Sequence, residues 1–392
     1  MKETLVSGSG AALGIALLIF ALTYSASTPR VLDIAPEVSI PVGDLSAIHA
    51  NTSVSSPLFS QEFVPTGYDI FDNLLLSNRT KSNISSTTTP SAASVSKALR
   101  TKQASSTPTL SPKTALTANT VALRGAAVNI LCTSKDGSVR SVSGSGVIID
   151  SRGIILTVAH VAQMYLLANY PTPGNVSCIV RTGSPAVSAY TAELVYISSD
   201  WITKYPNTLV AAAPTGTGAN DFALIAITGS TTNTPLPTDF PAVPLSTETP
   251  KAGDAVGVGS YGAQYLTSNE IRTGLYQTLV YGLILKDYTF TTNKVEALSI
   301  KAGAAAQPGS SGGGVVNTRG EYTGLITNSS NTGDFSTREL RAITPFHIRN
   351  SFKDDMGTEL DSYIANSSKQ ELIAAFKTKS AKLGALVINA IK

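Results

Sequence analysis

The distribution of apolar residues divides the chain into four stretches with different patterns. An uncharged, apolar run extends from Leu5 to Leu22. A long segment dominated by Ser, Thr, Ala and Pro follows, and near residue 120 it gives way to short apolar runs. Beyond Pro345 the apolar residues recur at helical spacing. Because the spacing of apolar residues is the main signal of secondary structure, each stretch predicts a different kind of structure.

The apolar run near the N-terminus predicts a membrane signal. About 18 uncharged residues are enough to span a bilayer, and a dense apolar core also suits a signal peptide. Small residues at Ser25, Ala26 and Ser27 provide a plausible cleavage site. We favour an uncleaved signal anchor within residues 1–27, with a cleaved signal peptide as the alternative. The first predicts a single-pass protein of the cell membrane with its folded part extracytoplasmic, and the second a secreted protein.

Residues 28–120 predict a stalk between the membrane and a folded region. From Asn78 to Thr120 the composition is dominated by Ser, Thr, Ala and Pro with scattered Lys. Such a segment buries too little apolar surface to offset the entropy lost on ordering. We therefore expect most of it to be a disordered tether.

Short runs of β character fill residues 121–350 and are separated by Gly, Asn and Pro. Many short strands at near-regular spacing are typical of β barrels and sandwiches. The scarcity of helices between them argues against a parallel α/β sheet. The proline-rich stretch Thr232–Pro244 divides the runs into two groups, about 121–231 and 245–350. The predicted strands are Val128–Thr133, Ser141–Ile149, Ile154–Leu156, Val176–Arg181, Thr191–Ser198, Phe222–Ile227, Ala255–Ser260, Leu275–Phe290, Val295–Ile300, Gly313–Val316, Tyr322–Thr327 and Arg341–Thr344.

The last part of the chain, residues 351–392, predicts a helical extension. Ser368 and Glu371 have the spacing of a capping box, in which each side chain satisfies a backbone N–H at the helix start. Apolar residues then recur at Leu372, Phe376, Leu383, Val387 and Ala390. We expect this helix to pack on the folded region with its basic face in solvent.

Composition excludes several classes of partner. Only 14% of the residues are charged and the net charge is +3, without a dense Lys/Arg stripe, so nucleic acid is not an expected partner. The cysteines and histidines lack metal-ligand spacing, so we predict neither a metal site nor a cofactor. Cys132 and Cys178 both lie in strand-like runs. They form either a disulfide, as an exported protein permits, or two buried thiols.

Three residues stand in local contexts suited to nucleophilic catalysis. His160 ends an apolar strand, and Asp221 begins a strongly apolar one. Ser311 lies in the Gly/Ser turn of Gln307–Val316, where glycines allow positive φ and close backbone approach. Each residue alone fits a structural role, since a buried histidine, a strand-capping aspartate and a loop serine are common. Together, in this order and each at a strand edge, they favour catalysis.

The segments around these residues resemble the trypsin-like (chymotrypsin-fold) serine proteases, with the bacterial HtrA-type branch nearest. Thr157–His160 resembles the histidine motif of that family, Asp221–Ile225 its aspartate motif, and Gln307–Gly313 its serine motif. The resemblance covers about residues 122–350. It implies an all-β fold of two six-stranded antiparallel barrels, here without the PDZ domain of many HtrA-type relatives.

The resemblance also implies a role for each motif residue. His160, oriented by Asp221, takes the proton from the Ser311 hydroxyl as that oxygen attacks a peptide carbonyl. The backbone N–H groups of Gly309 and Ser311 form the oxyanion hole.

The substrate-binding residues follow from the same resemblance. Ala305 and Ala306 line the expected specificity pocket, where an acidic residue is absent. The strand Ile326-Thr327-Asn328 corresponds to the edge that pairs with the backbone of the polypeptide substrate.

The sequence thus predicts a membrane-tethered, extracytoplasmic serine endopeptidase that hydrolyses peptide bonds in polypeptides through an acyl-enzyme. A catalytically inactive, protease-like binding module on the cell surface is the alternative. A stalk-borne adhesin would explain the Ser/Thr-rich tether and none of the three motifs.

Overall fold

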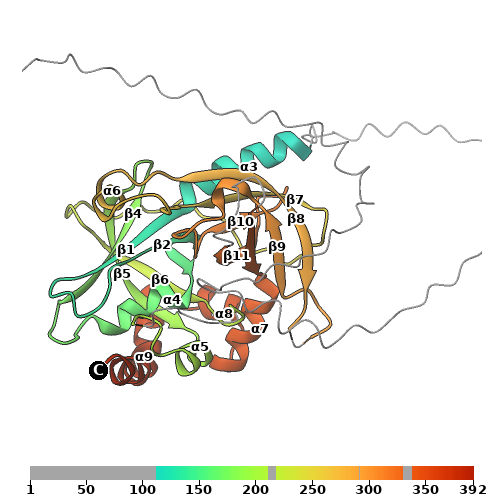
Figure 1. Cartoon of the computed structure of the whole chain (residues 1–392). Helices are drawn as coiled ribbons and strands as arrows, with labels where there is room; N and C mark the ends of the chain where they lie inside the picture. Colours follow the sequence, from blue (N-terminus) through green and yellow to red (C-terminus); the bar gives the residue numbers. More distant parts are fainter. Residues whose placement is uncertain (1–111, 211–217, 291, 330–337) are drawn as a thin grey trace, which may run out of the picture. The chain divides into compact units, whose positions relative to one another are not determined.

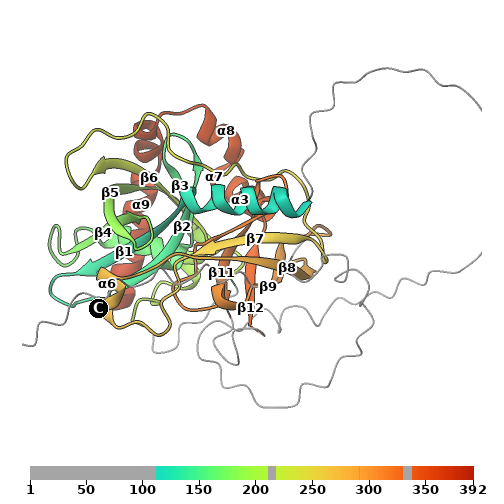
Figure 2. The same ribbon diagram turned by 90° about the horizontal axis from the view of Figure 1, so that it is seen from above.

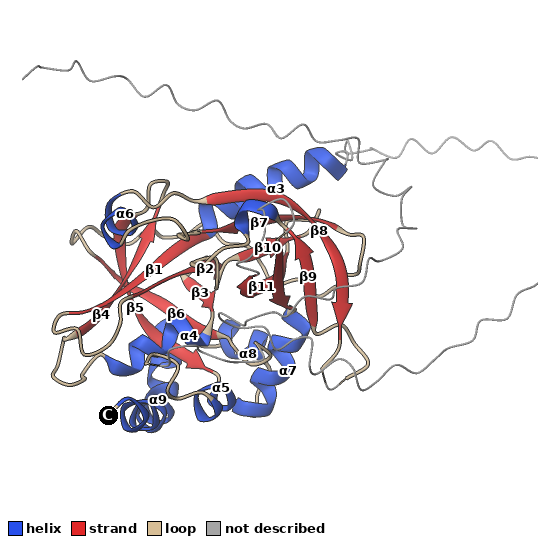
Figure 3. Cartoon of the chain, in the orientation of Figure 1, coloured by secondary structure: helices blue, strands red, loops and turns tan. Residues whose placement is uncertain are grey.

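The folded region consists of two β barrels with helices packed around them. The computed structural model describes residues 112–210, 218–290, 292–329 and 338–392. Both barrels close on themselves with six strands each, and every strand pair within them is antiparallel (Figures 1 and 3). The two-barrel, mostly β architecture expected from the sequence is confirmed.

The two barrels have the same strand order. Barrel 1 runs β1-β2-β3-β6-β5-β4 and barrel 2 runs β10-β11-β12-β9-β8-β7. The strands of barrel 1 are β1 (Ala127–Ser134), β2 (Val142–Asp150), β3 (Ile154–Thr157), β4 (Val176–Thr182), β5 (Val187–Ile197) and β6 (Ala223–Ser230). Those of barrel 2 are β7 (Ala255–Ser260), β8 (Thr278–Tyr288), β9 (Ala297–Lys301), β10 (Gly314–Val316), β11 (Tyr322–Ser329) and β12 (Glu339–Ile343).

Helices lie outside the barrels and in the loops between strands (Figure 3). They are α3 (Pro112–Ala126), α4 (Ala159–Ala162), η1 (Gln163–Leu167), α5 (Ser199–Lys204), α6 (Ser268–Thr273), η2 (Gly303–Ala305), α7 (Pro345–Met356), α8 (Leu360–Ala365) and α9 (Lys369–Ile391). Within the described ranges, no helix is both long and apolar enough to cross a membrane.

Helix α3 packs against barrel 2 because two glycines in β7 leave room for it (Figure 2). A Cβ at Gly257 would lie 2.3 Å from the Thr120 hydroxyl, and one at Gly259 would lie 2.9 Å from Leu123. Leu123 and Thr120 are buried on the side of α3 that faces this strand. The predicted stalk extended to residue 120, but the structure places residues 112–120 in α3.

The C-terminal helix α9 packs against barrel 1, where it contacts β5 and η1. The predicted capping box between Ser368 and Glu371 is present, with both reciprocal bonds formed. Leu372, Phe376 and Val387 are fully buried along one face of α9. The helical region begins earlier than expected, because Pro345 occupies the first turn of α7, where a missing N–H has no helical partner to lose.

The two segments predicted before the folded region lie almost entirely outside the residues that the structure describes. The signal anchor within residues 1–27 and the stalk up to residue 111 fall there. After β3, the chain forms α4 and then the 3-10 helix η1.

A disulfide joins neighbouring strands of barrel 1. Cys132 on β1 and Cys178 on β4 are directly opposite each other in the strand register, and their sulfur atoms are bonded. Of the two alternatives left open by the sequence, the structure has the disulfide. The two cysteines are separated by 46 positions in the sequence, so the disulfide closes a loop of that length.

We expect removal of this disulfide to destabilise barrel 1. Closing a loop of this length restricts the unfolded chain, and its loss typically lowers the free energy of unfolding by about 2–4 kcal/mol. The measurement is denaturant unfolding of the Cys132→Ala/Cys178→Ala double variant, with the wild type before and after reduction as the comparison. An unfolding midpoint that reduction leaves unchanged would contradict the expectation.

Candidate active site

Strand register brings His160 and Asp221 together. Thr157, the last residue of β3, pairs with Ala223, the first residue of β6. His160 follows β3 by three residues and Asp221 precedes β6 by two. Because antiparallel partners leave the ladder at the same end, both residues emerge at one end of barrel 1. One turn of helix, α4, then directs the imidazole towards the carboxylate.

The carboxylate of Asp221 receives two hydrogen bonds from His160. The backbone N–H of His160 donates to Oδ1 at 2.9 Å, and Nδ1 lies 2.7 Å from Oδ2. Asp221 is 1% exposed, so these bonds replace the water that a carboxylate would otherwise hold. Since an ionised carboxylate only accepts, Nδ1 carries the proton that it donates to Oδ2.

Ser311 stands at the corner of two consecutive type II turns. In the first, Ser310 N donates to Gln307 O at 3.1 Å and Gly309 has φ of +92°. In the second, Gly313 N donates to Ser310 O at 2.9 Å and Gly312 has φ of +90°. Each turn therefore has glycine at the position that requires positive φ, with Pro308 and Ser311 before them.

The turn of barrel 2 that carries Ser311 is hydrogen-bonded to β2 of barrel 1 through Ser145. Ser145 N donates to Ser311 O at 2.8 Å, and the Ser145 hydroxyl donates to Gly309 O at 2.8 Å. The same hydroxyl accepts the N–H of Tyr261 at 2.8 Å. Gly312 packs so closely that a Cβ there would lie 1.9 Å from Ser145 O. The buried Ser145 thus fixes the turn at three points.

This junction places Ser311 beside the helix that carries His160. A Cβ at Gly144 would lie 2.5 Å from the Val161 side chain and 3.4 Å from Ser311 O. Ser311 and the residue after His160 therefore approach the same point of β2. The Ser311 hydroxyl itself donates to the carbonyl oxygen of Thr327 at 3.2 Å.

A β-bulge exposes that carbonyl. On β11, Ile326 pairs with Ala342 and Asn328 with Arg341, which leaves Thr327 without a partner residue on β12. An unpaired bulge residue redirects its backbone groups out of the ladder. The Thr327 carbonyl is therefore available to a hydrogen-bond donor from outside the sheet.

The Gly309 amide faces away from the core of the loop. The Pro308 carbonyl accepts the N–H of Ala263 at 2.8 Å. In a trans peptide the C=O and the following N–H point in opposite directions, so the Gly309 N–H is directed away from Ala263. Within the described part of the chain, the N–H groups of Gly309 and Ser311 have no protein acceptor.

Most of the expected substrate-binding residues lie close to the turn that carries Ser311, and one of them has its backbone groups already bonded. Ala305 and Ala306 are fully buried just before it, and Thr327 and Asn328 lie on β11. Ile326 is differently placed: its N–H donates to Gly313 O at 3.0 Å and its C=O accepts from Gly312 N at 2.8 Å. Its backbone groups are thus already used within barrel 2, and we no longer expect Ile326 to pair with a substrate.

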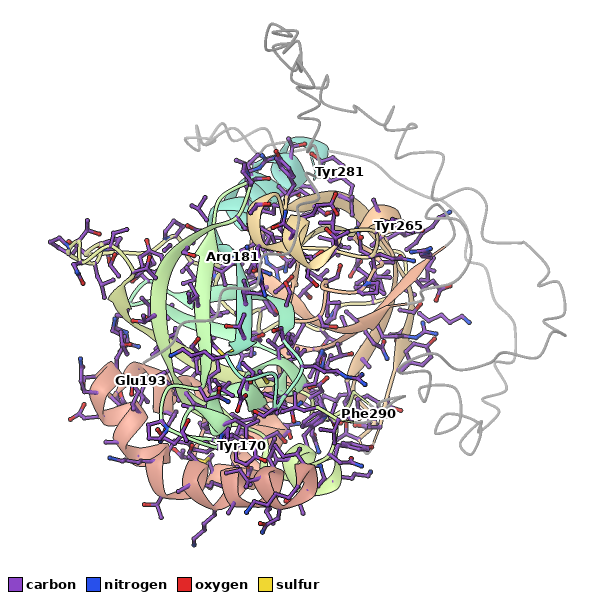
Figure 4. The ribbon with its side chains drawn as sticks, turned by 60° about the vertical axis from the view of Figure 1, so that its left-hand side comes forward. Tyr170, Arg181, Glu193, Tyr265, Tyr281 and Phe290 are labelled. Atoms are coloured by element: carbon purple, nitrogen blue, oxygen red, sulfur yellow. A yellow bond between two sulfur atoms is a disulfide. The ribbon has the colours of Figure 1, made fainter. Side chains whose placement is uncertain are left out.

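Sequence reasoning missed the residues that connect the two barrels. Ser145 lies within the predicted strand Ser141–Ile149 and was given no role of its own, although serine between two glycines is a signal of close backbone approach. Arg181, labelled in Figure 4, is 2% exposed and donates to Asn129 and to the carbonyls of Ile271 and Arg272. Burial raises the pKa of nearby Tyr261 to about 12, partly offset by the Arg181 charge.

No metal centre accompanies this site in the described ranges. A group of three or more His, Cys, Asp or Glu side chains that could hold an ion is not found there.

Comparison with known proteins agrees with this arrangement. Residues 144–325 match the family described as the trypsin-like peptidase domain. The chain carries a trypsin-like peptidase domain and is a trypsin-like serine hydrolase. The matched residues of the peptidase domain include His160, Asp221 and Ser311.

Solved structures of low identity also match the chain. The Rv3671c protease from M. tuberculosis in its active form is 17% identical, with 67% of this chain and 96% of that chain covered and a TM-score of 0.38. The inactive form of the Rv3671c protease is 17% identical, with 63% and 96% covered and a TM-score of 0.38. A comparison with curated proteins finds no match.

We expect Ser145→Ala to impair the peptidase domain in both stability and rate. The substitution leaves the buried N–H of Tyr261 and the carbonyl of Gly309 without a partner, at about 1–3 kcal/mol for each unsatisfied group. Thermal unfolding and peptide hydrolysis measure the two effects. Ser188→Ala is the matched control, because Ser188 is exposed on β5. Equal behaviour of the two variants would contradict the role given to Ser145.

Proposed function

We propose that this chain is an endopeptidase in which Ser311 is the nucleophile, His160 the general base and Asp221 the group that orients His160. The observation that carries the proposal is that the Asp221 carboxylate accepts two hydrogen bonds from His160. It fixes the proton on Nδ1 of His160, so that Nε2 can accept the proton of a hydroxyl.

The reaction divides into two halves. As the Ser311 oxygen attacks the peptide carbonyl carbon, its proton passes to Nε2 of His160. The tetrahedral intermediate then collapses, and Nε2 returns the proton to the departing amine. The acyl-enzyme left on Ser311 is hydrolysed by a water molecule whose proton takes the same route. Asp221 stays ionised throughout and stabilises the imidazolium.

The oxyanion that forms in both halves needs donors that are already in place. The N–H groups of Gly309 and Ser311 suit this role, since the turn geometry leaves them without protein acceptors in the described residues. Donors fixed in this way stabilise the transition state by roughly 3–4 kcal/mol each. Pro308 has no N–H, so it can only stiffen the turn.

Substrate binding would also prepare the nucleophile. We propose that a backbone N–H of the polypeptide donates to the Thr327 carbonyl and displaces the Ser311 hydroxyl bonded there at 3.2 Å. A rotation about the Cα–Cβ bond of Ser311 then turns the hydroxyl towards Nε2 of His160. Asn328, the next residue on β11, extends the pairing by β-augmentation.

The second candidate is a protease-like binding module without catalysis. The bond between the Ser311 hydroxyl and Thr327 favours it, because a hydroxyl that donates its one proton to that carbonyl does not at the same time donate it to the base. The two candidates differ in whether Ser311 reacts with an electrophile.

We expect Ser311→Ala to abolish hydrolysis of a protein substrate and labelling by a fluorophosphonate probe, which modifies activated serines. Loss of the nucleophile typically lowers kcat by about 10⁶-fold. Ser188→Ala, at an exposed position on β5, should retain both signals. Labelling that persists in Ser311→Ala would discard the proposal, and a wild type that neither cleaves nor labels would favour the binding module.

We further propose that residues 1–27 anchor the enzyme in the cell membrane and that its substrates are extracytoplasmic polypeptides. The uncharged run Leu5–Leu22 supports this. Deletion of residues 1–27 should move the protein from the membrane fraction to the soluble fraction. Leu17→Arg should weaken insertion by about 2.5–3.5 kcal/mol, whereas Ser55→Arg in the stalk should not. Membrane association that survives the deletion would refute the anchor.

A further inference from the structure

One face of helix α7 grips the segment that leads into Asp221. His347, Ser351 and Asp355 are spaced four residues apart, so they lie in a row along the helix. His347 Nε2 lies 2.6 Å from the carbonyl oxygen of Ala219, and the Ser351 hydroxyl donates to the Asn220 side chain at 2.8 Å. Helix α7 follows barrel 2 in sequence, whereas this segment belongs to barrel 1.

The third residue of the row anchors the helix to the same barrel. The Asp355 carboxylate accepts the Tyr196 hydroxyl at 2.9 Å and the Ser199 N–H at 3.1 Å. Lys379 of α9 also donates to it at 2.6 Å. Helix α7 is therefore held against barrel 1 at one end, and its other end presents His347 to Ala219.

The His347 ring faces hydrogen-bond acceptors on both sides. Its Nδ1 lies 3.3 Å from a carboxylate oxygen of Glu296, and its Nε2 faces the Ala219 carbonyl. A carbonyl oxygen only accepts, so Nε2 carries the proton that it donates to Ala219 O.

Glu296 connects this ring to barrel 2. It precedes β9, is 1% exposed, and accepts the backbone N–H groups of Phe290 and Thr292. The Phe290 ring, labelled in Figure 4, meets the His347 ring edge-on at 5.0 Å between centroids. Because His347 is 7% exposed and packs against the Phe290 ring and the buried Glu296 carboxylate, its ring has little room for another orientation.

We propose that His347 is a positioning residue for catalysis. Held by Glu296, its Nε2–H donates to Ala219 O and so fixes the segment Ala219–Asn220, which in turn fixes the Asp221 carboxylate against both N–H groups of His160. The inference rests on the function proposed above. His347 touches neither substrate nor nucleophile, so its loss should alter the turnover rate and not substrate affinity.

The test compares three variants in the full-length chain. His347→Ala removes the Nε2–H donor, and we expect kcat to fall by about 10- to 100-fold with KM changed less than about twofold, as for a misplaced catalytic group. His347→Gln keeps one N–H donor for Ala219 O, so it should recover most of the rate. Asp354→Ala, exposed on another face of α7, is the matched control. A folded His347→Ala with wild-type kcat, or Gln and Ala variants that are equally impaired, would overturn the proposal.

Two further measurements keep the proposal testable. If His347→Ala does not fold, Ser351→Ala removes only the bond to Asn220 from a partly exposed helix position and should lower kcat about threefold at unchanged KM; unchanged kcat would count against the proposal. The downfield NMR proton on His160 Nδ1, assigned by its loss in His160→Gln, should shift or broaden in His347→Ala or Ser351→Ala, less so in His347→Gln, and not in Asp354→Ala. This proton reports the contact without turnover, so an inactive wild type with the expected NMR change would refute the proposed function alone.

Discussion

The buried carboxylate of Asp221 is the constraint on which the active site depends. A carboxylate removed from water costs several kcal/mol unless donors replace the lost hydration. Both of the donors seen at Asp221 come from His160, one from its backbone and one from its ring. Because a single residue supplies both, the position of the main chain and the tilt of the imidazole are fixed together. The Nε2 edge is thereby directed away from the carboxylate.

Each barrel supports the proposed catalytic group that the other carries. Ser145 on β2 of barrel 1 holds the turn of barrel 2 that bears Ser311. Helix α7, which follows barrel 2, holds the segment of barrel 1 that bears Asp221. The distance between the proposed base and the proposed nucleophile is thus set by contacts from both directions. A displacement of either barrel would loosen the supports of both Ser311 and Asp221.

The sequence predicted the features that are determined by neighbouring residues, and it missed the contacts between residues far apart in the chain. The twelve strands follow from apolar runs of a few residues, and the capping box of α9 from two residues at fixed spacing. His160, Asp221 and Ser311 stand in recognisable local motifs. By contrast, the roles of Ser145 and His347 rest on partners more than 100 residues away, and no local pattern distinguishes them from other serines and histidines.

Helix α3 shows that amino-acid composition also fails to predict structure that depends on distant residues. Residues 112–120 share the Ser/Thr/Ala character of the preceding segment, and on that basis we assigned them to the stalk. The helix is stabilised by what it packs against, because Gly257 and Gly259 of β7 provide the groove that receives it. Tertiary packing of this kind overrides local composition. The information lay in two glycines some 130 residues further along the chain.

At the junction of the barrels, apolar contacts provide most of the stabilisation, whereas hydrogen bonds fix the orientation of individual groups. The larger apolar cluster includes Val316, Tyr322 and Leu325 of barrel 2 together with the interior of barrel 1. Burial of such side chains contributes about 1.5–3 kcal/mol each and has little directional preference. A typical hydrogen bond contributes only about 1 kcal/mol net but fixes distance and angle. The apolar cluster therefore holds the barrels together, while a few bonds at Ser145 and His347 orient the nucleophile and the base. Since those bonds are individually weak, the geometry of the site can be perturbed by substitutions that leave the fold intact.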